Sequence, residues 1–145
     1  MKLQDAGVAA AKKQGIDEVL VIYTSKLELK EWIGERQQWR DKQSIKPLQI
    51  ERARLLLREY SECALIIGKD ATGFTEALKK IEDELHAKGF YKAWAVCNDA
   101  LKNSLSMPCH MWFNIDIVAT LARYKKNMPV TVPGDYPPWG IILVQ

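Results

Sequence analysis

The segment Gly68–Gly73 has the glycine spacing of a phosphate-binding loop. It stands between an apolar run and an amphipathic segment, and Thr75 holds the hydroxyl position of the pattern G-x-x-x-x-G-K-[ST]. The lysine position is Phe74, which cannot place a positive charge on the outer phosphates. The sequence therefore favours a plain strand-to-helix turn in which Gly73 supplies an unusual backbone angle. An anion held by the amides of the helix start, beside Lys69, is the open alternative.

Polar residues follow three apolar runs at the points where strands are expected to end. In a parallel sheet such strand ends gather at one edge, which is where ligands bind. We therefore expect a crevice of hydroxyls, amides and one carboxylate, lined by Thr24, Ser25, Gly68, Lys69, Gly73, Thr75, Asn98 and Asp99. Because Ser, Thr, Asn and Asp are also the preferred helix caps, a purely structural role for these residues stays open.

A partial zinc-site pattern is also present. His86 and Cys109 occupy two ligand positions of the deaminase pattern H-x-E and P-C-x-x-C, whereas Lys88 and Trp112 replace the glutamate and the second cysteine. Catalytic zinc needs three protein ligands, and only two are present. The sequence predicts no metal and no cofactor, and since no catalytic set is complete, it favours a non-enzymatic protein.

Basic residues dominate the segment Lys26–Arg58, which holds nine Lys or Arg against five Asp or Glu. Tryptophans are interleaved with them, and basic side chains beside aromatic surfaces are typical of nucleic-acid contacts. Arg54 and Arg58 share one face of an expected helix. Nucleic-acid binding is therefore one hypothesis, with a solvated helix surface as the simpler interpretation.

Two tryptophans suggest a protein interface. Trp32 and Trp39 are seven residues apart and lie on one face of an expected helix, as do Arg36 and Arg40 at a spacing of four. Tryptophan is enriched at interface hot spots. We expect this helical region, residues 25–60, to contact a protein partner or a second copy of the chain, with core packing of the tryptophans as the alternative.

The expected elements alternate along the chain. Hydrophobic periodicity predicts helices over residues 2–14, 25–43, 47–60, 74–88, a short stretch after 98, and 109–125, although the last could be a strand. Apolar runs predict strands at residues 18–23, 63–67, 91–97 and 139–145. This alternation predicts an α/β fold, a three-layer domain with a short, mostly parallel sheet of about four strands. A mainly α-helical bundle is the alternative.

Composition is that of an ordinary single domain. The chain has 145 residues, a net charge of +3, three scattered cysteines and no apolar run long enough for a membrane span. We expect one domain over residues 1–145 and a cytoplasmic location. The favoured function is that of a binding or accessory protein acting through protein contacts. The alternatives are an enzyme or sensor for a phosphorylated small molecule or nucleotide, and a nucleic-acid-binding protein.

Overall fold

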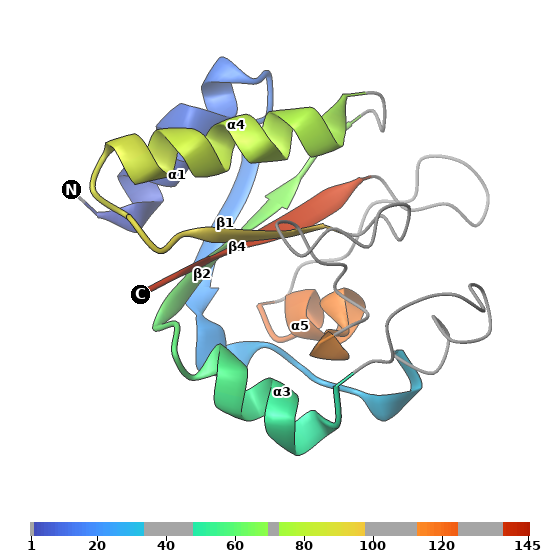
Figure 1. Cartoon of the computed structure of the whole chain (residues 1–145). Helices are drawn as coiled ribbons and strands as arrows, with labels where there is room; N and C mark the ends of the chain where they lie inside the picture. The colour runs from blue at the N-terminus through green and yellow to red at the C-terminus, as the bar shows by residue number, and fades with distance from the viewer. Residues whose placement is uncertain (1, 34–47, 70–72, 98–112, 125–137) are drawn as a thin grey trace.

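Four strands form one sheet at the centre of the molecule (Figure 1). The computed structural model describes residues 2–33, 48–69, 73–97, 113–124 and 138–145. The sheet has the order β1-β2-β4-β3, and every neighbouring pair is antiparallel. Its members are β1 (Glu18–Tyr23), β2 (Glu62–Ile67), β3 (Trp94–Cys97) and β4 (Trp139–Val144).

The expectation of a mostly parallel sheet is wrong, and so is the alternative of a helical bundle. Tyr23 pairs with Glu62, so the chain leaves β1 and enters β2 at the same end of the sheet. β2 and β3 point one way, since both run antiparallel to β4, which lies between them, and β1 and β4 point the other way, with β2 between them. Helix α4 (Phe74–Ala87) connects β2 and β3. Alternation of helices and strands did not reveal that strands of the same direction are separated by a strand of the opposite direction.

Helices cover both faces of the sheet, as the three-layer expectation required. In Figure 1, α1 (Leu3–Lys13) and α4 lie above the sheet, whereas α3 (Ile50–Leu57) and α5 (Ile117–Ala122) lie below it. Alternate residues of β2 enter the two cores, Ala64 and Ile66 on one side and Cys63 and Leu65 on the other. Apart from Glu62 at the start of β2, both central strands are therefore apolar, a pattern that is also typical of parallel strands.

The segment after β1 departs from the expected helix over residues 25–43. A short 3-10 helix, η1 (Thr24–Lys26), is followed by extended chain in which Leu29 forms a bridge with Ile115. Ser25 and Glu28 have the spacing of a helix capping box, but no helix begins at Ser25, and Glu28 forms an ion pair with Arg123. Tertiary contacts with the α5 region thus override the helix signal over residues 27–30, whereas residues 31–33 are helical as expected. Residues 34–43 of the expected helix lie outside the described residues.

The glycine-bracketed turn is explained by packing and backbone geometry. Gly73 has a φ of 74°, in the left-handed region, at the start of α4, which confirms the predicted role of this glycine. At Gly68 an added Cβ would lie 2.6 Å from the ring of Phe74. The buried ring needs a glycine beneath it, so Gly68 requires no ligand to account for it. Within the described ranges, no helix is both long and apolar enough to cross a membrane.

Candidate functional site

The predicted crevice is divided between the two ends of the sheet. Thr24 and Ser25 follow Tyr23, which pairs with the first residue of β2. Gly68 follows the last residue of β2, so the length of this strand separates it from Thr24. Asn98 and Asp99 lie outside the described residues. Because the sheet is antiparallel, the expected gathering of three strand ends does not occur.

A cavity of about 490 Å³ lies at the end of the sheet where β1 stops. Its walls come from the end of β1 and η1, the extended segment after it, α3 with the turn that follows, and the end of α5. We call it the Arg54 pocket; its polar lining residues are Tyr23, Thr24, Ser25, Glu28, Arg54, Arg58, Tyr60, Ser61 and Arg123. The pocket thus contains two of the predicted ligand residues, Thr24 and Ser25, together with three arginines and one glutamate.

Two of the arginines come from α3. Ala53 and Leu57 turn inward to the core, which leaves Arg54 and Arg58, one helical turn apart, exposed on the pocket side. Neither guanidinium group forms an ion pair or a side-chain hydrogen bond with another residue that the structure describes. Their charges are therefore free to bind an anion. The spacing of four residues was the sequence signal for this pair.

The third arginine belongs to a fixed wall. Nη1 of Arg123 donates to Oε1 of Glu28 at 3.0 Å. The backbone N–H of Glu28 in turn donates to Oγ1 of Thr120 at 2.9 Å, and its carbonyl oxygen accepts from the N–H of Asp116 at 2.8 Å. Asp116 also caps α5 by accepting from the N–H of Ala119. This network connects the extended segment to α5 and gives Arg123 its orientation.

The hydroxyl of Thr24 is the unusual group of the pocket. Thr24 is only 4% exposed, and its Oγ1 is a buried side-chain atom without a hydrogen-bond partner. The thiol of Cys63 lies near it: burial raises the pKa of Cys63 to about 12, and the approach of the Thr24 hydroxyl opposes part of that increase. A thiol is a weak acceptor, and the pair does not reach hydrogen-bond geometry. Such a group costs about 1–3 kcal/mol when unpaired.

Aromatic side chains border the charged part of the pocket. Tyr60 packs against Trp94 with ring centroids 6.2 Å apart, and Trp94 meets Phe113 edge-on at 5.6 Å. Burial, and then the charge of Glu59, raises the pKa of Tyr60, so its hydroxyl is neutral and can donate a hydrogen bond. Tyr23, 66% exposed, lies at the rim. The pocket therefore combines cationic groups with surface suited to an organic moiety.

The other predicted ligand residues surround a smaller hollow. A cavity of about 180 Å³ is lined by Gly68, Lys69 and Gly73, and the exposed Thr75 is not part of its lining. Lys69 lies 3.6 Å from Asp17 in an exposed ion pair. A helix start and one paired lysine give this hollow weaker support as an anion site than the Arg54 pocket has.

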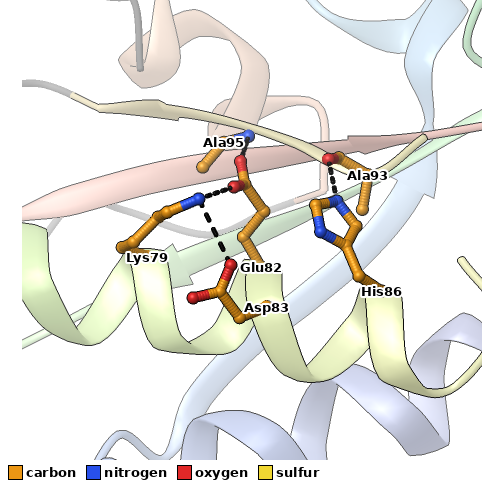
Figure 2. A network of polar contacts seen from close by, with 6 residues as sticks. All are labelled: Lys79, Glu82, Asp83, His86, Ala93 and Ala95. Carbon is orange, nitrogen blue, oxygen red and sulfur yellow. Dashed lines mark hydrogen bonds and ion pairs between the residues drawn. The ribbon is translucent and has the colours of Figure 1, made fainter. Parts of the chain in front are cut away.

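Three potential metal donors cluster on α4, but they already have partners. Carboxylate and imidazole atoms of Glu82, Asp83 and His86 lie within 4.8 Å of one another. Figure 2 shows the ammonium of Lys79 bound to both carboxylates, at 2.8 Å and 3.2 Å. The second oxygen of Glu82 accepts from the N–H of Ala95. These contacts make the cluster a structural network that joins α4 to β3.

The predicted interface is only partly described. The side chain of Trp32 is 46% exposed and makes contacts of its own. Arg36, Trp39 and Arg40 lie outside the described residues, as does Cys109 of the partial zinc pattern. Tryptophan at this position thus remains a candidate contact residue.

Comparison with known proteins adds no functional assignment. No protein-family model matches the chain, and searches of curated proteins and of solved structures found no match either. Function therefore has to be argued from the geometry of the Arg54 pocket.

Proposed function

We propose that this protein binds a small phosphorylated ligand in the Arg54 pocket, and that it acts as a binding or sensor protein. The observation that carries the proposal is the pair of arginines, Arg54 and Arg58, which line the cavity without an ion-pair partner among the described residues; Thr24, whose buried hydroxyl has no hydrogen-bond partner among those residues, belongs to the same lining. If the Thr24 side chain rotates toward the cavity, a ligand oxygen can accept from its hydroxyl, which removes the cost of the unpaired group. The site therefore favours the bound state.

Charge and size support an organic phosphate. Three arginines against one glutamate leave the lining cationic, and guanidinium groups bind phosphate oxygens with two parallel hydrogen bonds. A cavity of about 490 Å³ lies within the roughly 300–1,000 Å³ typical of small-ligand sites. Tyr23 and Tyr60 supply surface for the organic part of the ligand.

Binding without catalysis fits the described lining best. Its carboxylate, Glu28, is engaged by Arg123 and so is a poor general base. The hydroxyls of Thr24, Ser25 and Ser61 have no histidine or lysine among the described lining residues to activate them. The lining therefore offers recognition groups rather than a catalytic pair.

Thermal unfolding in the presence of inorganic phosphate and of a nucleoside monophosphate, at matched ionic strength, tests the proposal. A ligand at a hundred times its Kd stabilises the folded state by about 2.7 kcal/mol, which corresponds to about 8 °C for a chain of this size. The double variant Arg54→Gln/Arg58→Gln should lose this increase. Arg52→Gln, on the same helix but outside the pocket lining, should keep it. An unchanged melting temperature, or an equal increase in the double variant, contradicts the proposal.

A protein contact through Trp32 is the second candidate, supported by the exposure of nearly half of its side chain. In this alternative Trp32→Ala, alone or combined with Trp39→Ala, abolishes association of the folded protein in a sedimentation or pull-down experiment. A folded variant that still associates with the same affinity rules out this surface. The nucleic-acid hypothesis gains no comparable support, since much of the basic segment lies outside the described residues.

A further inference from the structure

The two edges of the sheet differ in how their backbone groups are occupied. At the β3 edge, side chains of α4 reach over the strand (Figure 2). Nε2 of His86 donates to the carbonyl oxygen of Ala93 at 2.7 Å, and Oε2 of Glu82 accepts from the N–H of Ala95 at 2.7 Å. These groups point away from β4, so the helix blocks the places where another strand would bind.

At the β1 edge, no residue of the described ranges gives such protection. The N–H of Thr24 donates to the carbonyl oxygen of Ser61 at 3.0 Å, which fixes the alternation of bonded and non-bonded pairs between β1 and β2. The outward-facing backbone groups of β1 are therefore those of Val19, Val21 and Tyr23. They form no hydrogen bond with any part of the chain that the structure describes. The strand also contains no proline or lysine, the residues that commonly protect an edge.

We propose that the β1 edge pairs with the β1 edge of a second copy of this chain, in an antiparallel two-fold arrangement. Because outward-facing residues must oppose each other, the central register places Val21 opposite Val21 and Val19 opposite Tyr23 of the second copy. The same register brings the acidic start of β1, Asp17 and Glu18, against the turn that ends in Lys26. This charge complementarity favours a second copy over an unrelated strand.

Because the β3 edge is blocked, strand pairing between copies of the chain is limited to two copies. In the part of the chain that the structure describes, β1 is the one open edge, so association stops at a dimer with one continuous eight-stranded sheet rather than extending into a filament. Partial exposure of Val19, Leu20 and Val21, in contrast to the fully buried β4, agrees with a strand that gains cover from a partner.

Sedimentation equilibrium of the full chain over a concentration series, with three variants, tests this dimer. Lys26→Glu places like charges at both ends of the paired strands, and we expect the dimer Kd to increase about tenfold, because two exposed charge pairs are affected. Glu18→Lys combined with Lys26→Glu restores opposite charges and should return the Kd to near its original value. Lys92→Glu, an equal charge change beside the β3 edge, should leave it unchanged.

A backbone variant supplies an independent readout. Val21→Pro removes an outward N–H that β2 does not use, so the folded variant should be monomeric by sedimentation and retain its far-UV circular dichroism. A monomeric wild-type protein at all concentrations overturns the proposal. So does a dimer that is insensitive to Lys26→Glu, or one that Trp32→Ala dissociates while the edge variants do not. Arg54→Gln/Arg58→Gln should dimerise normally, which separates this result from that of the pocket.

Discussion

A single hydroxyl in the Arg54 pocket makes opposite contributions to stability and binding. Thr24 is buried at the end of β1 with no hydrogen-bond partner for Oγ1, which destabilises the free protein. Thr24→Val keeps the shape of the side chain and removes the unpaired group, so it should increase the free energy of unfolding by about 1 kcal/mol in urea denaturation. The same variant should bind phosphate about tenfold more weakly in calorimetry, because the bound anion loses a donor.

Ser25→Ala is the matched control for this prediction, since Ser25 is exposed at the same pocket and its change leaves no buried group behind. If Thr24→Val is less stable than the wild type, or if its phosphate affinity is unchanged, the Thr24 hydroxyl does not bind the ligand.

Gly68 matches the glycine spacing of a phosphate-binding loop, but the structure accounts for it by packing against Phe74. Its Cα lies so close to Phe74 that an added Cβ would be 2.6 Å from Cδ1 of the ring. Gly68→Ala should therefore lower the free energy of unfolding by about 1–3 kcal/mol, because the buried ring must shift. Phosphate affinity of the folded variant should be unchanged, since the Arg54 pocket lies at the other end of β2. In a Phe74→Leu background, Gly68→Ala should lower the free energy of unfolding by less, because the smaller leucine side chain leaves room for the added Cβ.

Some residues of the Arg54 pocket could be predicted from the sequence, but not that they lie together. Thr24 and Ser25 were predicted as ligand residues from hydroxyls at a strand end, whereas Arg54 and Arg58 were paired by their helical spacing in the nucleic-acid hypothesis and not with the crevice. Arg123 could not be connected with them, because it reaches the pocket through Glu28, 95 residues earlier in the chain. A contact of this separation leaves no periodic signal in one sequence.

At the scale of elements, strong local patterns predicted well and weak ones did not. The apolar stripe of α4 and its glycine-bounded ends appear in the structure as expected. The Ser25–Glu28 capping box failed: no helix begins at Ser25, Glu28 forms an ion pair with Arg123, and the segment pairs with the α5 region through Leu29. Local helix propensity is overridden where a distant element supplies both hydrogen bonds and burial to the same segment.

The contact between α1 and α4 predicts a pH dependence of stability. A hydrogen bond from Lys13 lowers the pKa of Glu84 below its ordinary value of 4.5. The folded-state pKa is thus below the unfolded-state value, so the stabilisation is complete above about pH 4.5 and is lost as pH falls through the lowered pKa. In urea denaturation, the free energy of unfolding should decrease less between neutral pH and about pH 3 in Lys13→Met than in the wild type, because the variant lacks the ion pair that acid disrupts.

Lys12→Met is the control, since Lys12 is the exposed neighbour of Lys13 and forms no ion pair with the described residues. It should keep the acid dependence of the wild type. Equal acid sensitivity in the two variants would assign the effect to another carboxylate.

At the scale of the whole molecule, the layers were predictable and the strand directions were not. Continuous apolar strands indicated a sheet covered on both faces, which the structure has. The direction of β2 relative to β1 depends on the end of the sheet at which the chain re-enters after residues 24–61, and the hydrophobic pattern does not indicate that end. The predicted crevice failed for this reason alone, since its residues were placed at strand ends that point in opposing directions.

The asymmetry of the two edges makes a final prediction about the assembled protein. Glu82 is 3% exposed and holds the N–H of Ala95, so Glu82→Ala frees an outward group of the β3 edge. A chain with two open edges no longer stops at a dimer, and light scattering should show growth into larger species that increases with concentration. Simple destabilisation could also cause aggregation, and a second substitution separates the two causes. Adding Val21→Pro closes the β1 edge and should suppress growth, although it makes the fold no more stable; if aggregation instead increases, edge pairing is not its cause.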